Sequence, residues 1–392
     1  MNREIQPETE RRMTAAESGS GGAGQNARSD RGACAPKPCV SAAAGEPRIE
    51  AVIPVYHPDE RLDAALELLS RQRQPVVCIH LMDTLRPDGS SSLRAELRNR
   101  PGVVVHEVPH AEFDHGGTRR LGASLCEGAD YLLFMTQDAV PVGEELTAAL
   151  LAGFSGQAGE DLSSGEPRRQ RSGAFAQSEE GLSSEKPVVA VSFARQLARQ
   201  GASVEERLTR EFNYPGTPSL RTRADLDRLG IKTYFCSNVC AMYDARVYRA
   251  LGGFVQRTIF NEDMLYAAAA VQAGYAVFYA AAAEVVHSHA YTAEEQLRRN
   301  FDLGVSQAEH PEVFLAIRSE REGMRYVRTM LRALRANGAG GEIPGFLLRC
   351  AARFIGYRAG RSYRRLPMAL IRRLTMSPNY WKETGKSDHH PL

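Results

Sequence analysis

The feature of this sequence that most constrains its fold is a series of short apolar runs with helical patterns between them. One apolar run covers residues 49–56, and an amphipathic pattern follows it through residues 62–69. Two more apolar runs cover residues 75–83 and 101–108. Strand, helix and strand at this spacing predict βαβ units, whose strands are parallel and whose helices cover the sheet. We therefore expect an α/β domain built on a mostly parallel central sheet.

A fourth apolar run, Tyr131–Met135, predicts a buried strand that ends in a polar triplet containing Gln137 and Asp138. Open α/β sheets bind their ligands at the carboxyl ends of the parallel strands, where Asp138 would lie. A carboxylate at that edge suits a divalent cation such as Mg²⁺ or Mn²⁺, which binds oxygen ligands and bridges to a diphosphate. The alternative is that Asp138 caps a helix beginning near Gly143 or closes a turn.

A glycine pair, Gly116 and Gly117, lies between the third and fourth predicted strands and predicts a tight turn into a helix. Free backbone N–H groups and the helix dipole favour phosphate at such a helix N-terminus. Arg119 and Arg120 fall in the first turn, which is a poor place for cations unless an anion binds there. The alternative is a glycine turn followed by two solvated arginines.

Two acids follow Asn261, which we expect to cap a helix whose first turn carries Glu262 and Asp263. Acids in a first turn interact favourably with the helix dipole, so capping alone can explain both residues. If the helix begins in the same cleft as Asp138, however, Asp263 is well placed to act as a general base.

The run 284–291 carries His287 and His289 at alternate positions. In a strand, residues two apart point to the same face. A single histidine is usually a core or surface residue, whereas two on one face after a strand of this sheet indicate a metal ligand.

These motifs, in this order, resemble the family-2 glycosyltransferases of the GT-A fold, and among them the bacterial rhamnosyltransferases of polysaccharide assembly. Each motif alone is weak, but the series is specific, and the resemblance covers roughly residues 49–311. The motifs are Val52-Ile-Pro-Val-Tyr, His115-Gly-Gly-Thr-Arg-Arg, Met135-Thr-Gln-Asp-Ala, Ser237-Asn-Val-Cys-Ala, Gly252-Gly-Phe, Asn261-Glu-Asp, His287-Ser-His and Asn300-Phe-Asp-Leu-Gly-Val. The resemblance implies a Rossmann-like, mostly parallel sheet flanked by helices, with a helical extension at the C-terminus.

The resemblance also implies which residues bind the nucleotide of a nucleotide-sugar donor. Pro54, Tyr56 and Asp83 match positions that line the nucleobase and ribose, and Arg119 matches a basic position that approaches the nucleotide. Gln137, beside the metal-binding position, is included with these nucleotide-binding residues. Arg120 stands where the family pattern often has asparagine.

The residues that match the family's metal-binding and catalytic positions are acids and a histidine. Asp138 matches the metal-binding aspartate of a D-x-D-type motif that here keeps one acid, and His287 is similar to an additional metal ligand. Asp263 matches the catalytic base, with Glu262 beside it as an acceptor or positioning contact. Inverting transfer requires one base on the acceptor hydroxyl and one cation, Mg²⁺ or Mn²⁺, on the leaving diphosphate. Family likeness alone favours L-rhamnose from dTDP-L-rhamnose as the donor sugar, and a polysaccharide or lipid-linked glycan as the acceptor.

Two other classes of protein are alternatives to an active sugar transferase. A nucleotide-sugar-binding or scaffold protein that kept this fold and lost activity is one alternative, because Asp138 is the single acid of its motif. A nucleotidyltransferase would share the sheet and metal, but it usually carries a glycine-rich loop with Lys or Arg after the first strand, where this sequence has Pro58-Asp-Glu-Arg. The formal net charge of +2 does not favour a nucleic-acid partner.

Composition divides the chain into a catalytic domain and its appendages. We expect a disordered leader over residues 1–47, a GT-A domain over 48–311 with a low-complexity insertion at 155–186, and a basic helical region over 312–392. The leader lacks the apolar core of a secretion signal, which favours a cytoplasmic protein.

The C-terminal region is basic, with fifteen Lys or Arg against four Asp or Glu between Arg321 and Leu392. Basic amphipathic helices can lie on an anionic membrane, which would make the protein peripheral on the inner face of the plasma membrane. The alternative is a helical subdomain packed on the catalytic domain with solvated arginines.

Overall fold

The computed structural model of the protein describes residues 45–154, 186–314 and 320–382. Residues 1–44 of the predicted leader and 155–185 of the predicted insertion lie outside the described residues. The basic C-terminal region is described up to Lys382, apart from residues 315–319.

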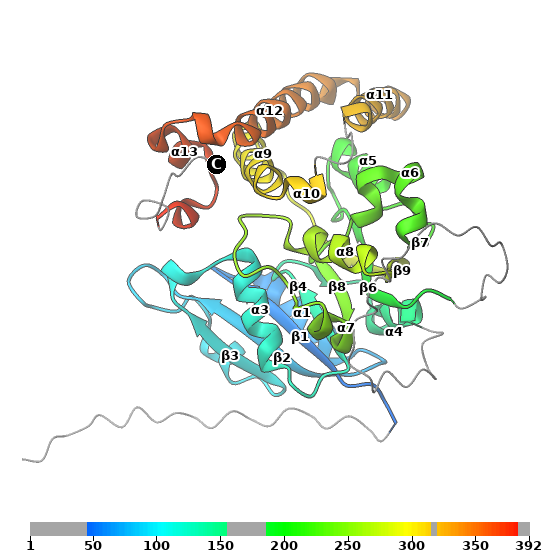
Figure 1. Ribbon diagram of the computed structural model, residues 1–392, viewed down its shortest axis with the longest axis vertical. Coiled ribbons are helices and arrows are strands. Elements are labelled where there is room, and N and C mark those ends of the chain that lie inside the picture. Colours follow the sequence, from blue (N-terminus) through cyan, green and yellow to red (C-terminus); the bar gives the residue numbers. More distant parts are fainter. Residues whose placement is uncertain (1–44, 155–185, 315–319, 383–392) are drawn as a thin grey trace, which may run out of the picture. The chain divides into compact units, whose positions relative to one another are not determined.

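The described strands form one nine-stranded sheet. They are β1 (Ile49–Val55), β2 (Val76–Thr84), β3 (Val103–Val108), β4 (Tyr131–Met135), β5 (Val140–Pro141), β6 (Val189–Leu197), β7 (Ser219–Arg221), β8 (Cys240–Asp244) and β9 (Ala276–Val286). Their order is β3-β2-β1-β4-β8-β6-β9-β5, and β7 also pairs with β9 (Figure 1). Strands β1, β2, β3, β4, β6 and β9 run in one direction, and β5, β7 and β8 run in the other. The predicted mostly parallel α/β sheet is therefore confirmed.

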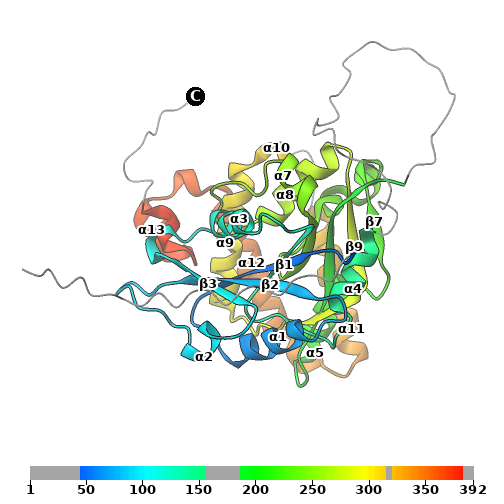
Figure 2. The ribbon, with the colours of Figure 1, turned by 90° about the horizontal axis from the view of Figure 1, so that it is seen from below.

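Helices flank both faces of the sheet. The described helices are α1 (Glu60–Ser70), α2 (Ala95–Arg98), α3 (His115–Leu125), α4 (Leu146–Leu151), α5 (Val204–Asn213), α6 (Leu226–Leu229), α7 (Ala245–Ala250), α8 (Glu262–Gln272), α9 (Ala293–Glu309), α10 (Pro311–Phe314), α11 (Glu320–Ala336), α12 (Ile343–Arg361) and α13 (Met368–Leu374). In Figure 2, α1 and α2 lie on one face of the sheet, and α3, α7 and α8 lie on the other.

Side chains alternate between the two faces along the strands, as a pleated sheet requires. On β1, Ile49, Ala51 and Ile53 belong to the same buried cluster as Leu62 of α1, whereas Val52 belongs to the cluster on the opposite face. This alternation gives the sheet a buried apolar layer on each side.

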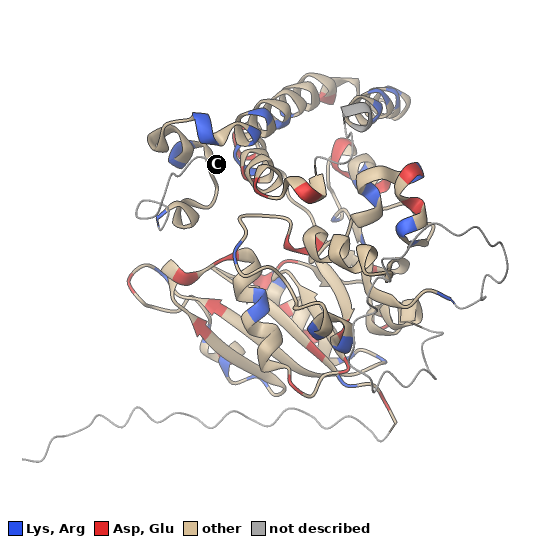
Figure 3. Ribbon diagram, viewed as in Figure 1, with Lys and Arg blue, Asp and Glu red and all other residues tan. Residues whose placement is uncertain are grey.

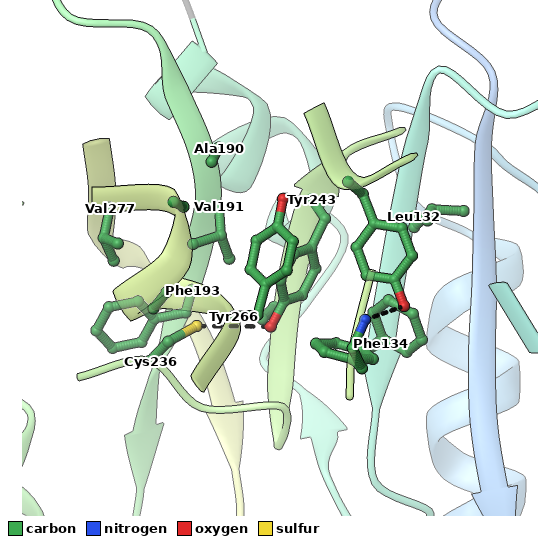
Figure 4. Close-up of a cluster of buried hydrophobic side chains, with 14 of the residues drawn as sticks. Leu132, Phe134, Ala190, Val191, Phe193, Cys236, Tyr243, Tyr266 and Val277 are labelled. Atoms are coloured by element: carbon green, nitrogen blue, oxygen red, sulfur yellow. Dashed lines mark hydrogen bonds between the residues drawn. The ribbon is translucent and has the colours of Figure 1, made fainter. Parts of the chain in front are cut away.

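Aromatic rings fill the layer beneath α7 and α8. Phe134 of β4 and Tyr243 of β8 meet edge to face, with ring centroids 5.3 Å apart, and Tyr266 of α8 packs against Tyr243 at 5.1 Å (Figure 4). Tyr243 also donates its hydroxyl hydrogen to Asn238 Oδ1 at 2.7 Å. The core therefore holds the segment just before β8 in a fixed position.

The C-terminal helix α12 packs closely on α9 through glycines. A Cβ atom at Gly356 would lie 2.1 Å from the carbonyl oxygen of Leu297, and one at Gly360 would lie 2.1 Å from that of Phe301. Only residues without a side chain permit such an approach of two helix backbones. The contact fixes α12 against a helix that follows directly from the sheet.

Candidate active site

Asp138 and two histidines meet at the edge of the sheet. Asp138 lies in the loop between β4 and β5, and His287 and His289 directly follow β9. Antiparallel pairing places Val140 of β5 opposite Val286 of β9, which brings the two segments together. Asp138 Oδ2 lies 2.9 Å from His289 Nε2 and 3.5 Å from His287 Nε2, and the two Nε2 atoms are 2.9 Å apart. We call these three residues the Asp138 cluster.

Two polar groups lie beside Nδ1 of His287. Arg210 Nη1 donates to Gln196 Oε1 at 2.5 Å, so this amide atom is an acceptor, and His287 Nδ1 lies 3.1 Å from it. Gln196 Oε1 can accept the proton of His287 Nδ1, whereas Arg210 Nη2, 3.4 Å from the same nitrogen, can donate to it. Burial lowers the pKa of His287 to about 4, so its ring is neutral at pH 7.

Asp138 is ionised although it is 8% exposed. Burial acts to raise the pKa of its carboxyl group, but hydrogen bonds and charge interactions with His287 and His289 outweigh burial and hold that pKa well below its usual range. A cation approaches from α1, where Arg61 Nη1 lies 3.5 Å from Asp138 Oδ2. Asp59, which caps α1, holds Arg61 through a 2.6 Å ion pair.

Asp263 lies in the first turn of α8, where two backbone groups bind its carboxylate. Asn238 N–H donates to Oδ2 at 3.0 Å, and Met264 N–H donates to Oδ1 at 2.8 Å. Burial raises the pKa of Asp263 to about 7, and the adjacent charge of Glu262 acts in the same direction. A half-buried carboxyl group with a pKa near 7 can accept a proton at neutral pH.

Glu262, in contrast, is buried and paired. Its Oε1 lies 3.2 Å from Arg119 Nη1 and accepts a hydrogen bond of 3.2 Å from Asn238 Nδ2. Burial acts to raise the pKa of Glu262, but Arg119 and His115 lower it overall, so this acid stays charged. Asn238 therefore bonds to both predicted acids, and the structure brings Arg119 to Glu262.

The expected side-chain cap of α8 by Asn261 is wrong, and so is the alternative of two solvated arginines. Asn261 occupies the N-cap position of α8, but its backbone is left-handed (φ 66°) and its side chain donates to Ser306 Oγ at 3.1 Å instead of capping the helix. Arg119 is buried rather than solvated. Arg120 donates to the carbonyl oxygens of Gly252 and Phe254, because the loop before α8 turns back over α3.

The residues predicted to bind the nucleotide lie at the carboxyl ends of β1, β2 and β4. Gln137 bridges to the backbone of Tyr56, accepting from its N–H at 2.7 Å and donating to its carbonyl oxygen at 2.9 Å. Pro54 lies in β1 opposite Met82. Asp83 Oδ2 accepts from Ser91 Oγ at 2.5 Å and from Arg98 at 2.8 Å. Its Oδ1 is buried and has no hydrogen-bond partner within the described ranges.

Two cavities adjoin these residues. A cavity of about 440 Å³ is lined by Tyr56 and by the segment that follows α13. A cleft of about 1140 Å³ is lined by His287, His289, Ser237 and residues of α5, α9 and α12. Arg299 of α9 lines both cavities.

The segment 237–239 connects the Asp138 cluster to Asp263. Val239 accepts a backbone hydrogen bond of 3.2 Å from Thr136, in the loop that carries Asp138, and Asn238 binds Asp263. Ser237 and Val239 line the same cleft as the two histidines. The two histidines of the predicted metal site therefore line this cleft, and the predicted base is hydrogen-bonded to a segment that lines it.

Several residues of this site were not assigned from the sequence. His289 was noted for its spacing, but its place as a third member of the cluster depends on how the chain leaves β9. Arg61 ends the stretch Pro58-Asp-Glu-Arg, which predicts no contact with Asp138, and Gln196 lies near the end of β6 without a motif around it. The i, i+2 spacing of the histidines was the only signal among these.

Comparison with known proteins gives the family. The scan against family models finds no match. The O-antigen chain rhamnosyltransferase RfbN of Salmonella typhimurium is 31% identical over 335 residues, which are 85% of this chain and 96% of the relative. The O-antigen chain rhamnosyltransferase WbaN of Salmonella anatum is 31% identical over 337 residues, 86% and 96% of the two chains. The chain belongs to the O-antigen chain rhamnosyltransferase family. The resemblance to bacterial rhamnosyltransferases is confirmed, and the protein is a glycosyltransferase.

Solved structures similar to this rhamnosyltransferase family member share less of its sequence. The mannosyltransferase PcManGT from Pyrobaculum calidifontis, in complex with GDP-Man and Mn²⁺, has a TM-score of 0.45 and 15% identity, covering 90% of this chain and 92% of its own. S. aureus TarS 1-349 has a TM-score of 0.41 and 13% identity, covering 81% and 91% of the two chains.

Proposed function

We propose that the protein is an inverting, metal-dependent rhamnosyltransferase that moves L-rhamnose from dTDP-L-rhamnose to a glycan of the O-antigen. The observation that carries the proposal is that the loop of Asp138 and the carboxylate of Asp263 are both hydrogen-bonded to the segment 237–239. Its relatives RfbN and WbaN are named as O-antigen chain rhamnosyltransferases, which supports both the sugar and the acceptor class.

The Asp138 cluster fits a divalent metal ion. Its members offer one carboxylate oxygen and two imidazole nitrogens, all within 4.8 Å of one another. With Gln196 Oε1 accepting the proton of His287 Nδ1, Nε2 would be free to bind metal. Nitrogen ligands suit Mn²⁺ better than Mg²⁺, which prefers oxygen, so of the two we favour Mn²⁺. A bound divalent ion would neutralise charge on the leaving diphosphate.

Asp263 is the general base in this proposal. Its pKa of about 7 lets it accept the proton of the acceptor hydroxyl at neutral pH, and its backbone bonds to Asn238 and Met264 fix its orientation. Glu262 positions Asn238 by accepting a hydrogen bond from its side chain. Arg119 compensates the buried charge of Glu262.

The nucleotide is proposed to bind at the carboxyl ends of β1 and β2. Pro54 and Tyr56 would contact the base and ribose, with Gln137 holding the backbone of Tyr56. The free Oδ1 of Asp83 is suited to accept a hydrogen bond from a base N–H group. A carboxylate that keeps one buried acceptor free supports a polar ligand at this place.

The acceptor is proposed to be a lipid-linked glycan that enters the 1140 Å³ cleft beside the histidines. We place the enzyme in the cytoplasm, peripheral on the inner face of the plasma membrane, because a lipid-linked acceptor is anchored in that membrane. The basic C-terminal helices complement its anionic lipids.

The test is donor turnover by the purified full chain. dTDP-L-rhamnose and UDP-hexoses are offered separately with Mn²⁺, with Mg²⁺ and with EDTA, and release of the nucleoside diphosphate and the anomeric configuration of the product are measured. We expect turnover of dTDP-L-rhamnose with Mn²⁺, loss of turnover with EDTA, and an inverted product. Donor binding without turnover in the presence of acceptor would favour the inactive nucleotide-sugar-binding alternative.

A further inference from the structure

Helix α12 exposes a row of large apolar side chains. Phe354 is 66% exposed, Leu348 62% and Ile355 57%, and Leu347 is also exposed. At 100° per residue these four side chains lie on one side of the helix, which we call the outer face of α12. The exposure of so many neighbouring apolar groups is unusual for a surface that meets only water.

Exposed arginines without acidic partners lie on this helix and in the segment that follows it. Residues 343–382 contain eight arginines, one lysine and no acid. Arg358 of α12 is exposed, as are Arg365 and the pair Arg372 and Arg373 of α13, and none of the four forms an ion pair within the described part of the chain. In the ribbon of Figure 3, α12 and α13 carry blue segments for Lys and Arg, and residues 343–382 contain no red ones for Asp and Glu. An anionic partner would complement the surface.

The opposite side of α12 lines the cleft of the active site. Gly345, Arg349 and Arg353 contribute to that cleft, together with Arg299 of α9. The close glycine contact of α12 with α9 fixes the two faces relative to each other. A surface that bound the outer face would therefore be held at a fixed position relative to the cleft.

We propose that the outer face of α12 docks on the surface of an anionic lipid bilayer, with Phe354, Ile355 and Leu348 inserted among the lipids and the arginines at the headgroups. This inference rests on the proposed function in one respect, since docking would bring a lipid-linked acceptor to the cleft. No described helix is both long and apolar enough to cross a bilayer, so the contact is interfacial.

The test is flotation of the full chain with vesicles, without donor or acceptor. Vesicles of phosphatidylcholine alone are compared with vesicles that also contain phosphatidylglycerol. The variant Phe354→Asp/Ile355→Asp probes the apolar face, and Arg358→Glu/Arg365→Glu probes charge. The control Arg73→Glu/Arg228→Glu makes the same change in net charge at two other exposed arginines. Circular dichroism and thermal unfolding confirm that each variant is folded.

We expect the wild type to bind phosphatidylglycerol vesicles with an affinity that falls as salt is added. Both test variants should lose at least about tenfold in this affinity, and the control should bind with an affinity close to that of wild type. Wild-type protein that stays with the buffer would overturn the proposal, as would an apolar-face variant that binds like wild type. A dimer that dissociates in Phe354→Asp/Ile355→Asp, without vesicle binding by the wild type, would assign the face to a second copy and also overturn it.

Turnover of the donor with a short soluble acceptor separates this inference from the proposed function. We expect the apolar-face variant to retain that turnover while it loses vesicle binding. If wild type binds vesicles but shows no turnover, the docking surface stands and the proposed function fails.

Discussion

The backbone N–H of Asn238 donates to Asp263 Oδ2 at 3.0 Å, and this bond ties the predicted base to the segment that reaches the Asp138 cluster. Asn238 also bonds through its side chain to Glu262 and to Tyr243. The orientation of Asp263 thus depends on a residue fixed by the aromatic core.

Replacement of the base should abolish transfer. Asp263→Asn keeps the size of the side chain but cannot accept the proton, and we expect kcat to fall by about 10²–10⁴-fold while the affinity for dTDP is unchanged. Kinetics and calorimetry measure the two quantities. Asp227→Asn, in the first turn of α6, is the matched control. Turnover of Asp263→Asn within a few-fold of wild type would remove Asp263 from this role.

The rate should depend on pH through Asp263. The base must be deprotonated, and its pKa is raised to about 7, so kcat/KM should fall about tenfold for each pH unit below 7 and level off above 8. Initial rates between pH 5.5 and 9 give the profile, with circular dichroism as the control for folding. A rate that does not change between pH 6 and 8 would contradict the assignment.

His289 should be needed for metal binding. Loss of one of three ligands in His289→Ala should weaken Mn²⁺ binding by at least about tenfold, as measured by isothermal titration calorimetry. Gln196→Leu, which removes the acceptor for His287 Nδ1, should weaken it by about 10–100-fold. His310→Ala, at the end of α9, is the control. Unchanged affinity in His289→Ala would exclude that residue as a ligand.

The glycine contact between α9 and α12 should be sensitive to a single methyl group. Gly356→Ala would place Cβ 2.1 Å from a backbone oxygen of α9, and we expect a loss of about 1–3 kcal/mol in the free energy of unfolding. Gly340→Ala, where nothing lies within 4 Å of the added Cβ, should be close to neutral. Denaturant unfolding of both variants measures the difference. Equal stability would show that α12 can shift away from α9.

The sheet could be predicted from the sequence, and the main acids could be proposed as site residues, because both leave local signals. Apolar runs such as Tyr131–Met135 specify strands, and the polar residues after them lie at the carboxyl edge. The pairing of Glu262 with Arg119 could not be predicted, because that contact joins α8 to α3 through tertiary packing. The role of Gln196 could not be predicted either, because nothing in the sequence of β6 indicates which residues its amide group contacts.

The pairing of β5 with β9 determines when the Asp138 cluster is assembled during folding. Asp138 and its histidine partners belong to the middle and the late parts of the chain, and this short antiparallel contact at the margin of the sheet brings them together. A polypeptide whose last strand has not yet docked would possess the carboxylate without the imidazoles. If the cluster binds a metal ion, binding should therefore require the whole sheet to be folded, and not only its first half.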